Sequence, residues 1–172
     1  MKCLRSVLLA SIFATFLFSN CNSPKSNGLS NKLEGVWTVV EIIFEYKDST
    51  QIISNPQPGI WIFSEEYYSA TWTLSAEERK PYQQAFNPTS DEIIAAYSSI
   101  VVNTGTYELT DTTLTTYPVV SRVPAFSGGK AIYELKGDSD VIFLTIKEEY
   151  SKTGEWARFL DNVHYTLKLK KK

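Results

Sequence analysis

The sequence of 172 residues has few of the side chains from which metal centres and hydrolytic active sites are built. It contains two cysteines, one histidine and one methionine. Structural zinc sites made of cysteine and histidine need four such ligands and are therefore excluded. The single histidine, His164, does not belong to any recognisable motif of a serine-histidine-aspartate triad. The motifs GxGxxG, GxxxxGK and GxSxG do not occur. We expect no metal, no cofactor and no catalytic residue of these classes.

Neither sign of charge is in excess. The chain has 17 Lys and Arg against 19 Asp and Glu, a formal net charge of −2. Because a nucleic-acid-binding surface needs a surplus of positive charge, we expect no nucleic-acid partner. The lysines at 168 and 170–172 are interpreted as the solvated end of a strand. The hydrophobic content of 43% is enough for the core of one domain.

A single apolar run, Val7–Phe18, stands out near the N-terminus. It follows Lys2 and Arg5, and its 12 residues are too few to cross a bilayer as a helix. Cys21 comes three residues later and resembles the cysteine that is lipidated in bacterial lipoproteins. Residues 1–20 are predicted to be a lipoprotein signal peptide and residues 21–31 a flexible tether, which leaves a domain over 32–172. An ordinary secretory peptide with an incidental cysteine is the alternative.

Lipidation of Cys21 predicts where the protein resides. Cys3 would leave with the signal peptide, so Cys21 would be the only cysteine and no intramolecular disulfide could form. Acyl chains such as palmitate would hold the protein in a membrane. We expect a lipid-anchored protein of the cell envelope, on the outer-membrane or periplasmic side, and a monomer.

The rest of the chain reads as many short strands. β-Branched and aromatic residues alternate with turn-forming clusters at a spacing of about 8–12 residues, which favours an antiparallel barrel or sandwich. The expected strands are Val36–Tyr46, Gly59–Ser64, Tyr67–Leu74, Gly105–Leu109, Thr113–Val123, Lys130–Leu135, Val141–Lys147, Glu155–Leu160 and Val163–Lys170. Two helical signals interrupt them: a capping box at Ser75 and Glu78, weakened by Pro81, and a stronger helix over Ser90–Ser99 with Ser90 as its cap.

These pieces, taken in order, resemble the lipocalin-like domain family of bacteria over roughly residues 33–169. The resemblance rests on LEGVW at 33–37, PQPGIWIF at 56–63, Tyr68-Ser69-Ala70, a helical Asp-Glu segment at 91–97, GTYEL at 105–109, Pro124, Tyr133-Glu134-Leu135 and Gly137-Asp138. The chain departs from the family where Thr116 and Tyr117 replace histidines and Ile132 replaces an arginine. Functions that use those side chains are not implied here.

The resemblance implies an all-β fold, an up-and-down antiparallel barrel of about 8–10 strands, with a short helical insertion. Barrels of about eight strands can hold one small ligand. In this family Gly35 would let the chain turn closely into the barrel and Trp37 would plug its closed end, so both are interpreted as structural.

A small apolar or amphipathic ligand in the barrel is the expected partner. Tyrosine and tryptophan combine an apolar body with a polar tip and suit such a ligand. Glu41 shares the alternation of Trp37, which would turn it inward with Arg122 as its partner, unless a bulge turns it out to solvent. The candidate ligand-binding residues are Glu41, Tyr68, Trp72, Tyr97, Tyr107, Tyr117, Arg122, Tyr133 and Tyr165. The alternatives are a cavity enzyme of the isomerase or lyase type, and an envelope interaction module with a filled barrel.

Overall fold

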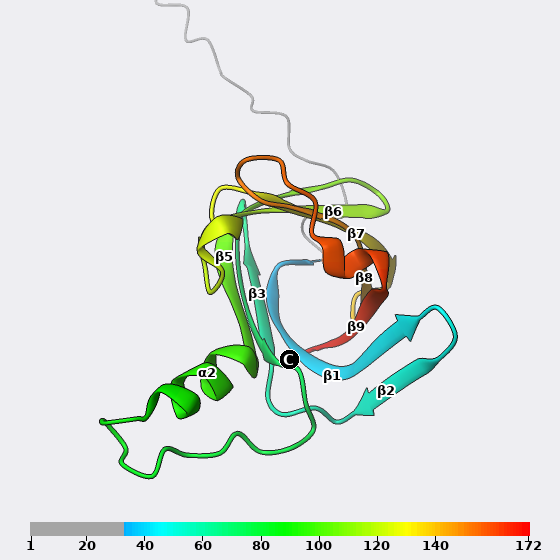
Figure 1. Cartoon of the computed structure of the whole chain (residues 1–172). Coiled ribbons are helices and arrows are strands. Elements are labelled where there is room, and N and C mark those ends of the chain that lie inside the picture. Colours follow the sequence, from blue (N-terminus) through cyan, green and yellow to red (C-terminus); the bar gives the residue numbers. More distant parts are fainter. Residues whose placement is uncertain (1–32) are drawn as a thin grey trace, which may run out of the picture.

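A computed structural model describes residues 33–172, and these residues form one closed antiparallel barrel (Figure 1). Neighbouring strands in the barrel are also neighbours in the sequence, as in an up-and-down barrel, and β9 pairs with β1 to close it. The barrel strands are β1 (Gly35–Tyr46), β3 (Ile60–Ser64), β4 (Tyr67–Thr73), β5 (Ile100–Leu109), β6 (Thr113–Ser121), β7 (Lys130–Gly137), β8 (Val141–Tyr150) and β9 (Val163–Lys171). The all-β fold expected from the sequence is confirmed.

The long strand β1 pairs with three other strands. Its first half pairs with β3 and its second half pairs with β2 (Thr50–Ser54), while β9 runs along its other edge. The hairpin β1–β2 therefore extends beyond the barrel wall (Figure 1). Strand β2 is absent from the expected strands, because its five residues lie between two turn-forming clusters and most of its side chains are exposed.

A β-bulge in β1 changes which of its side chains face inward. Trp37 and Val39 are buried, but the register against β9 shifts between Val39 and Glu41, and Ile42 is the next buried residue. One extra residue in a strand reverses the alternation of everything beyond it. Glu41 consequently faces outward, with its carboxylate 4.0 Å from the Lys168 ammonium.

One end of the barrel is closed by large apolar side chains. Trp37 is fully buried, and its indole N–H donates a 2.7 Å hydrogen bond to the Leu33 carbonyl oxygen. Gly35 has φ +123°, a left-handed conformation that suits glycine where the chain turns into β1. The structural roles expected for Gly35 and Trp37 agree with this geometry.

The middle of the barrel is filled by a cluster of aromatic rings around Trp61. Its ring stacks on Phe63, Tyr68 and Trp72 at centroid separations of 5.5–5.9 Å. The edge of Tyr133 meets the same ring at 5.8 Å. Because rings fill the middle and Trp37 the closed end, the apolar cavity of the described residues lies toward the opposite end of the barrel.

Two of the expected segments differ in the structure. Residues 75–85 form no helix; Ser75 accepts a hydrogen bond from the Glu77 N–H in a local turn instead, and Pro81 cannot continue a helix. Residues 155–160 form no strand. Only an isolated bridge from Trp156 to Tyr150 is present, followed by a 3-10 helix, η2 (Arg158–Asp161). A second 3-10 helix, η1 (Pro124–Phe126), joins β6 to β7.

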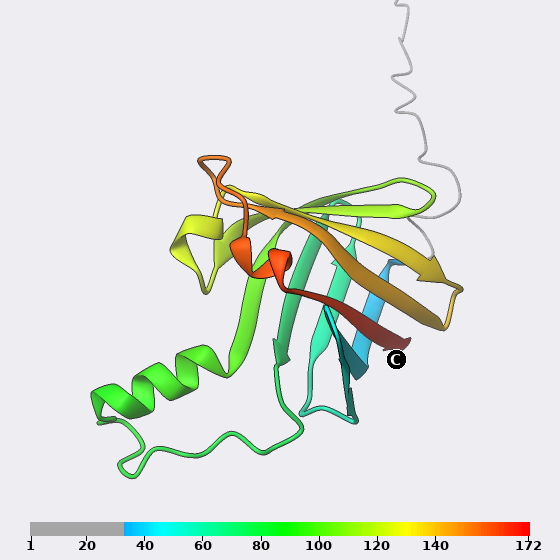
Figure 2. The ribbon, with the colours of Figure 1, turned by 45° about the vertical axis from the view of Figure 1, so that its right-hand side comes forward.

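The expected helix is present as α2 (Ser90–Ser98), with Thr89 rather than Ser90 as its cap. Thr89 and Glu92 form a reciprocal capping box, and hydrogen bonds from the backbone N–H groups of Gln83 and Thr89 lower the pKa of the Glu92 carboxyl. No residue of α2 is buried, and the helix projects from the barrel beside the start of β5 (Figure 2). Its existence therefore depends on the cap more than on packing.

Replacing Thr89 by alanine is expected to unfold α2 locally while leaving the barrel intact. Loss of an N-cap costs about 1 kcal/mol, which is large for a nine-residue helix with no buried face. Amide hydrogen exchange in residues 90–98 should become faster, and the unfolding midpoint of the barrel should stay unchanged. Ser90→Ala is the matched control, and an equal effect there would contradict the assignment of Thr89 as the cap.

Candidate functional site

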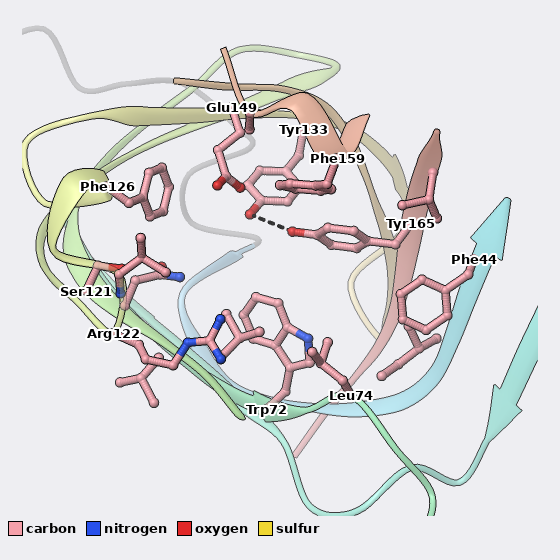
Figure 3. Close-up of a pocket in the computed structure, with 17 residues that line it drawn as sticks. Phe44, Trp72, Leu74, Ser121, Arg122, Phe126, Tyr133, Glu149, Phe159 and Tyr165 are labelled. Carbon is pink, nitrogen blue, oxygen red and sulfur yellow. Dashed lines mark hydrogen bonds between the residues drawn. The ribbon is translucent and has the colours of Figure 1, made fainter. Parts of the chain in front are cut away.

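The open half of the barrel contains a cavity of about 410 Å³. Residues of β4 and β9 line it, together with the start of β5 and the C-terminal ends of β6 and β8. Its walls are largely apolar and aromatic (Figure 3). Trp72 forms its floor next to the filled middle of the barrel. Phe44, Phe126 and Phe159 supply further ring faces from β1, η1 and η2.

One carboxyl group, that of Glu149, faces this cavity. Ile142, Leu144 and Ile146 of β8 point inward, so regular alternation would place Glu148 inside and Glu149 outside. The register between β7 and β8 shifts at Ile132/Tyr133, and beyond the shift Glu149 lies opposite buried Ala131. The bulge thus turns Glu149 into the cavity.

Burial changes the acidity of Glu149. Removal from water raises the pKa of this carboxyl to about 7, and the positive charge of Arg122 acts in the opposite direction. Within residues 33–172 the carboxylate makes no direct hydrogen bond or ion pair. Glu149 is therefore a partly buried acid that exists in both protonation states near neutral pH.

Two tyrosine hydroxyls lie on the same side of the cavity. The Tyr133 and Tyr165 hydroxyl oxygens are 3.4 Å apart, with Tyr133 on β7 and Tyr165 on β9 (Figure 3). Burial is the main cause that raises the pKa of both phenols, so both remain protonated and able to donate hydrogen bonds.

Arg122 approaches the cavity from the opposite side. Its guanidinium carbon lies 4.6 Å from the centre of the Tyr97 ring, and its Nη1 donates to the Tyr97 carbonyl oxygen. The Tyr97 hydroxyl in turn donates to the Arg122 carbonyl oxygen over 3.1 Å. Tyr97 on α2 thus holds Arg122 at the rim, in a clamp made of backbone and ring contacts.

The structure brings together four of the nine candidate residues proposed from the sequence. Trp72, Arg122, Tyr133 and Tyr165 line the cavity. Tyr68 and Tyr107 are buried in the aromatic core, at Trp61 and Phe63 respectively, and do not reach the cavity. Contact of these two side chains with a ligand therefore stays a prediction that the cavity lining does not support.

The other three candidates lie outside the cavity. The bulge in β1 turns Glu41 outward, which is the alternative that the sequence left open, and Glu41 does not pair with Arg122. Tyr117 points from the outer face of β6 and donates to Glu108 over 3.0 Å. Tyr97 contacts Arg122 at the rim and does not line the wall. His164 is exposed, as the parity of its strand predicts.

The family model of the lipocalin-like domain matches residues 34–160 of this chain. The chain belongs to the lipocalin-like domain family. Binding of small ligands inside the barrel is the general role that this family membership supports. No curated protein matches the chain.

Among residues 33–172, no helix is both long enough and apolar enough to cross a membrane. The signal peptide and the lipidation site at Cys21 lie outside the described residues. They remain predictions of the sequence.

Proposed function

We propose that the protein is a lipid-anchored binding protein of the cell envelope whose barrel holds one small apolar or amphipathic ligand. The observation that supports the binding role most strongly is the cavity of about 410 Å³ with apolar and aromatic walls. Ligand pockets are commonly about 300–1,000 Å³ and combine such walls with a few polar groups. Glu149, Arg122, Tyr133 and Tyr165 are the ionisable groups here, and Asn103 and Ser121 are uncharged polar residues of the same lining.

The binding role predicts that filling the cavity abolishes binding. Val101 on β5 lines the cavity beside Trp72, so Val101→Trp would place a large ring in the ligand's volume. We expect the affinity for the neutral apolar probe N-phenyl-1-naphthylamine to fall at least about tenfold, measured by the rise in its fluorescence on binding. Val119→Trp is the matched control because Val119 is 69% exposed on β6.

Two results would contradict the binding role. The first is a fluorescence titration of the unchanged protein in which the probe does not bind. The second is equal probe binding by Val101→Trp and Val119→Trp, which would place the probe outside the barrel.

The anchoring role rests on the sequence of residues 1–31. We expect radioactive palmitate to label the protein at Cys21, and Cys21→Ser to remove both the label and the recovery of the protein in the membrane fraction. Stable attachment requires more than one acyl chain, so the labelled protein should resist extraction from the membrane by salt and yield to detergent. An unlabelled protein that is released without detergent would contradict anchoring and leave the binding role untouched.

A further inference from the structure

The polar groups of the cavity lie on two facing walls. Arg122 reaches in from one side, and Glu149 lies with the hydroxyls of Tyr133 and Tyr165 on the other (Figure 3). The space between them is bounded mostly by aromatic and aliphatic side chains. A ligand's polar group placed there would meet both walls at once.

Arg122 is a cation that lacks an acidic partner in direct contact within the described chain. Its guanidinium contacts a carbonyl oxygen and the ring of Tyr97, neither of which carries a full negative charge. Its Nε is buried and has no hydrogen-bond partner among residues 33–172. A partly desolvated cation without a counter-charge in direct contact is unfavourable, and an anion in the cavity would supply that contact.

The other ionisable groups of the cavity also favour a ligand with a negative charge. Arginine only donates hydrogen bonds, and the two phenols retain their protons and can donate. Glu149 also becomes a donor when it is protonated, which leaves the lining with one positive charge from Arg122. A cationic ligand would add to that charge, whereas an anionic one would cancel it.

We propose that the ligand is an amphiphile with a single carboxylate, seated between Arg122 and the Tyr133–Tyr165 pair, with its apolar chain against Trp72, Phe126 and Phe159. This assignment rests on the proposed binding function and specifies its ligand class. Charge-assisted hydrogen bonds from a guanidinium and hydroxyls are the strong type for a carboxylate. The aromatic walls would cover the chain.

Glu149 links the binding of a carboxylate to the uptake of a proton. The ionisable groups that interact with it are Arg122 beyond β6, Tyr68 on β4, Tyr133 on β7 and Tyr165 on β9. Of these, only Arg122 is charged near pH 7. A bound carboxylate would repel ionised Glu149 and accept a hydrogen bond from the protonated form, so binding takes up a proton.

The test compares three ligands of equal chain length: decanoate, decan-1-ol and decylamine. Each is used to displace N-phenyl-1-naphthylamine from the full protein at pH 6 and pH 8.5. Decanoate is ionised at both values, since an alkyl carboxylate titrates close to an exposed glutamate side chain, whose pKa is about 4.3. We expect decanoate to bind most tightly at pH 6, and its affinity to fall by up to about tenfold per pH unit above 7.

Two variants separate the contributions of the walls. Arg122→Gln should weaken decanoate binding at least about tenfold more than it weakens decan-1-ol binding. Arg79→Gln, in the loop before α2, is the matched control and should affect neither ligand selectively. Glu149→Gln keeps a neutral donor, so it should remove the pH dependence and bind decanoate more tightly than the unchanged protein at pH 8.5.

The outcomes distinguish this inference from the proposed function. Decan-1-ol or decylamine binding as tightly as decanoate at pH 6 would overturn the carboxylate assignment and leave ligand binding intact. If the probe binds and none of the three ligands displaces it, the carboxylate assignment is likewise overturned and ligand binding remains intact. Absence of any probe binding would instead contradict the proposed function.

Discussion

Trp37→Ala should lower the free energy of unfolding by about 3–5 kcal/mol, the usual cost of removing a large buried aromatic side chain. Trp37 is fully buried and closes the barrel at the end where β1 begins. The substitution would also leave the Leu33 carbonyl oxygen without the indole N–H that donates to it. Urea denaturation followed by circular dichroism measures the change.

Trp156→Ala provides the matched control for this prediction. Trp156 is only partly buried, between β8 and η2, where its indole N–H donates to Asp161 over 3.0 Å. Its removal should cost clearly less than the removal of Trp37. A loss below about 1 kcal/mol for Trp37→Ala would show that Trp37 is not the plug of the barrel.

Glu149→Gln should make the protein more stable at pH 8, by about 2 kcal/mol. The folded protein raises the pKa of Glu149 from 4.5 to about 7, so between these values the folded state binds more protons than the unfolded state. The free energy of unfolding therefore decreases as the pH rises from about 4.5 to 7, and glutamine does not titrate. The full pKa shift corresponds to about 3 kcal/mol in the free energy of unfolding. We expect the smaller value of about 2 kcal/mol because water in the cavity screens the carboxylate.

The pH dependence of this effect is the sharper measurement. Below about pH 4.5 Glu149 is protonated in both states, so Glu149→Gln and the unchanged protein should be equally stable. Glu148→Gln, one residue earlier on the outer face of β8, is the matched control, because it removes a carboxyl that does not line the cavity. A stability difference that is the same at about pH 4.5 and about pH 8 would contradict the burial of an unpaired Glu149 carboxyl.

Regular alternation made three of the cavity residues predictable. Trp72 shares its face of β4 with buried Tyr68 and Ala70, and no bulge separates them. Tyr133 and Tyr165 likewise continue the buried faces of β7 and β9. Where a strand alternates without interruption, the sequence specifies which side chains reach the interior.

Two β-bulges explain why Glu149, and not Glu41, faces the cavity. The bulge after Val39 turns Glu41 out, and the bulge in β8 turns Glu149 in. A bulge adds one residue to one strand, and its position depends on the register of the partner strand, which the local sequence does not specify. Glu148 and Glu149 are adjacent in the sequence, so only the three-dimensional pairing distinguishes the inward carboxyl from the outward one.

The central claim, that a small ligand binds inside the open half of the barrel, is tested most directly by NMR of the tryptophan indoles. The ¹H–¹⁵N signals of Trp37, Trp72 and Trp156 report on the closed end, the cavity and the outer loop respectively. Saturation with N-phenyl-1-naphthylamine should shift the Trp72 signal and leave those of Trp37 and Trp156 in place. A saturated protein whose Trp72 signal does not move, or in which the Trp156 signal alone moves, would contradict the claim.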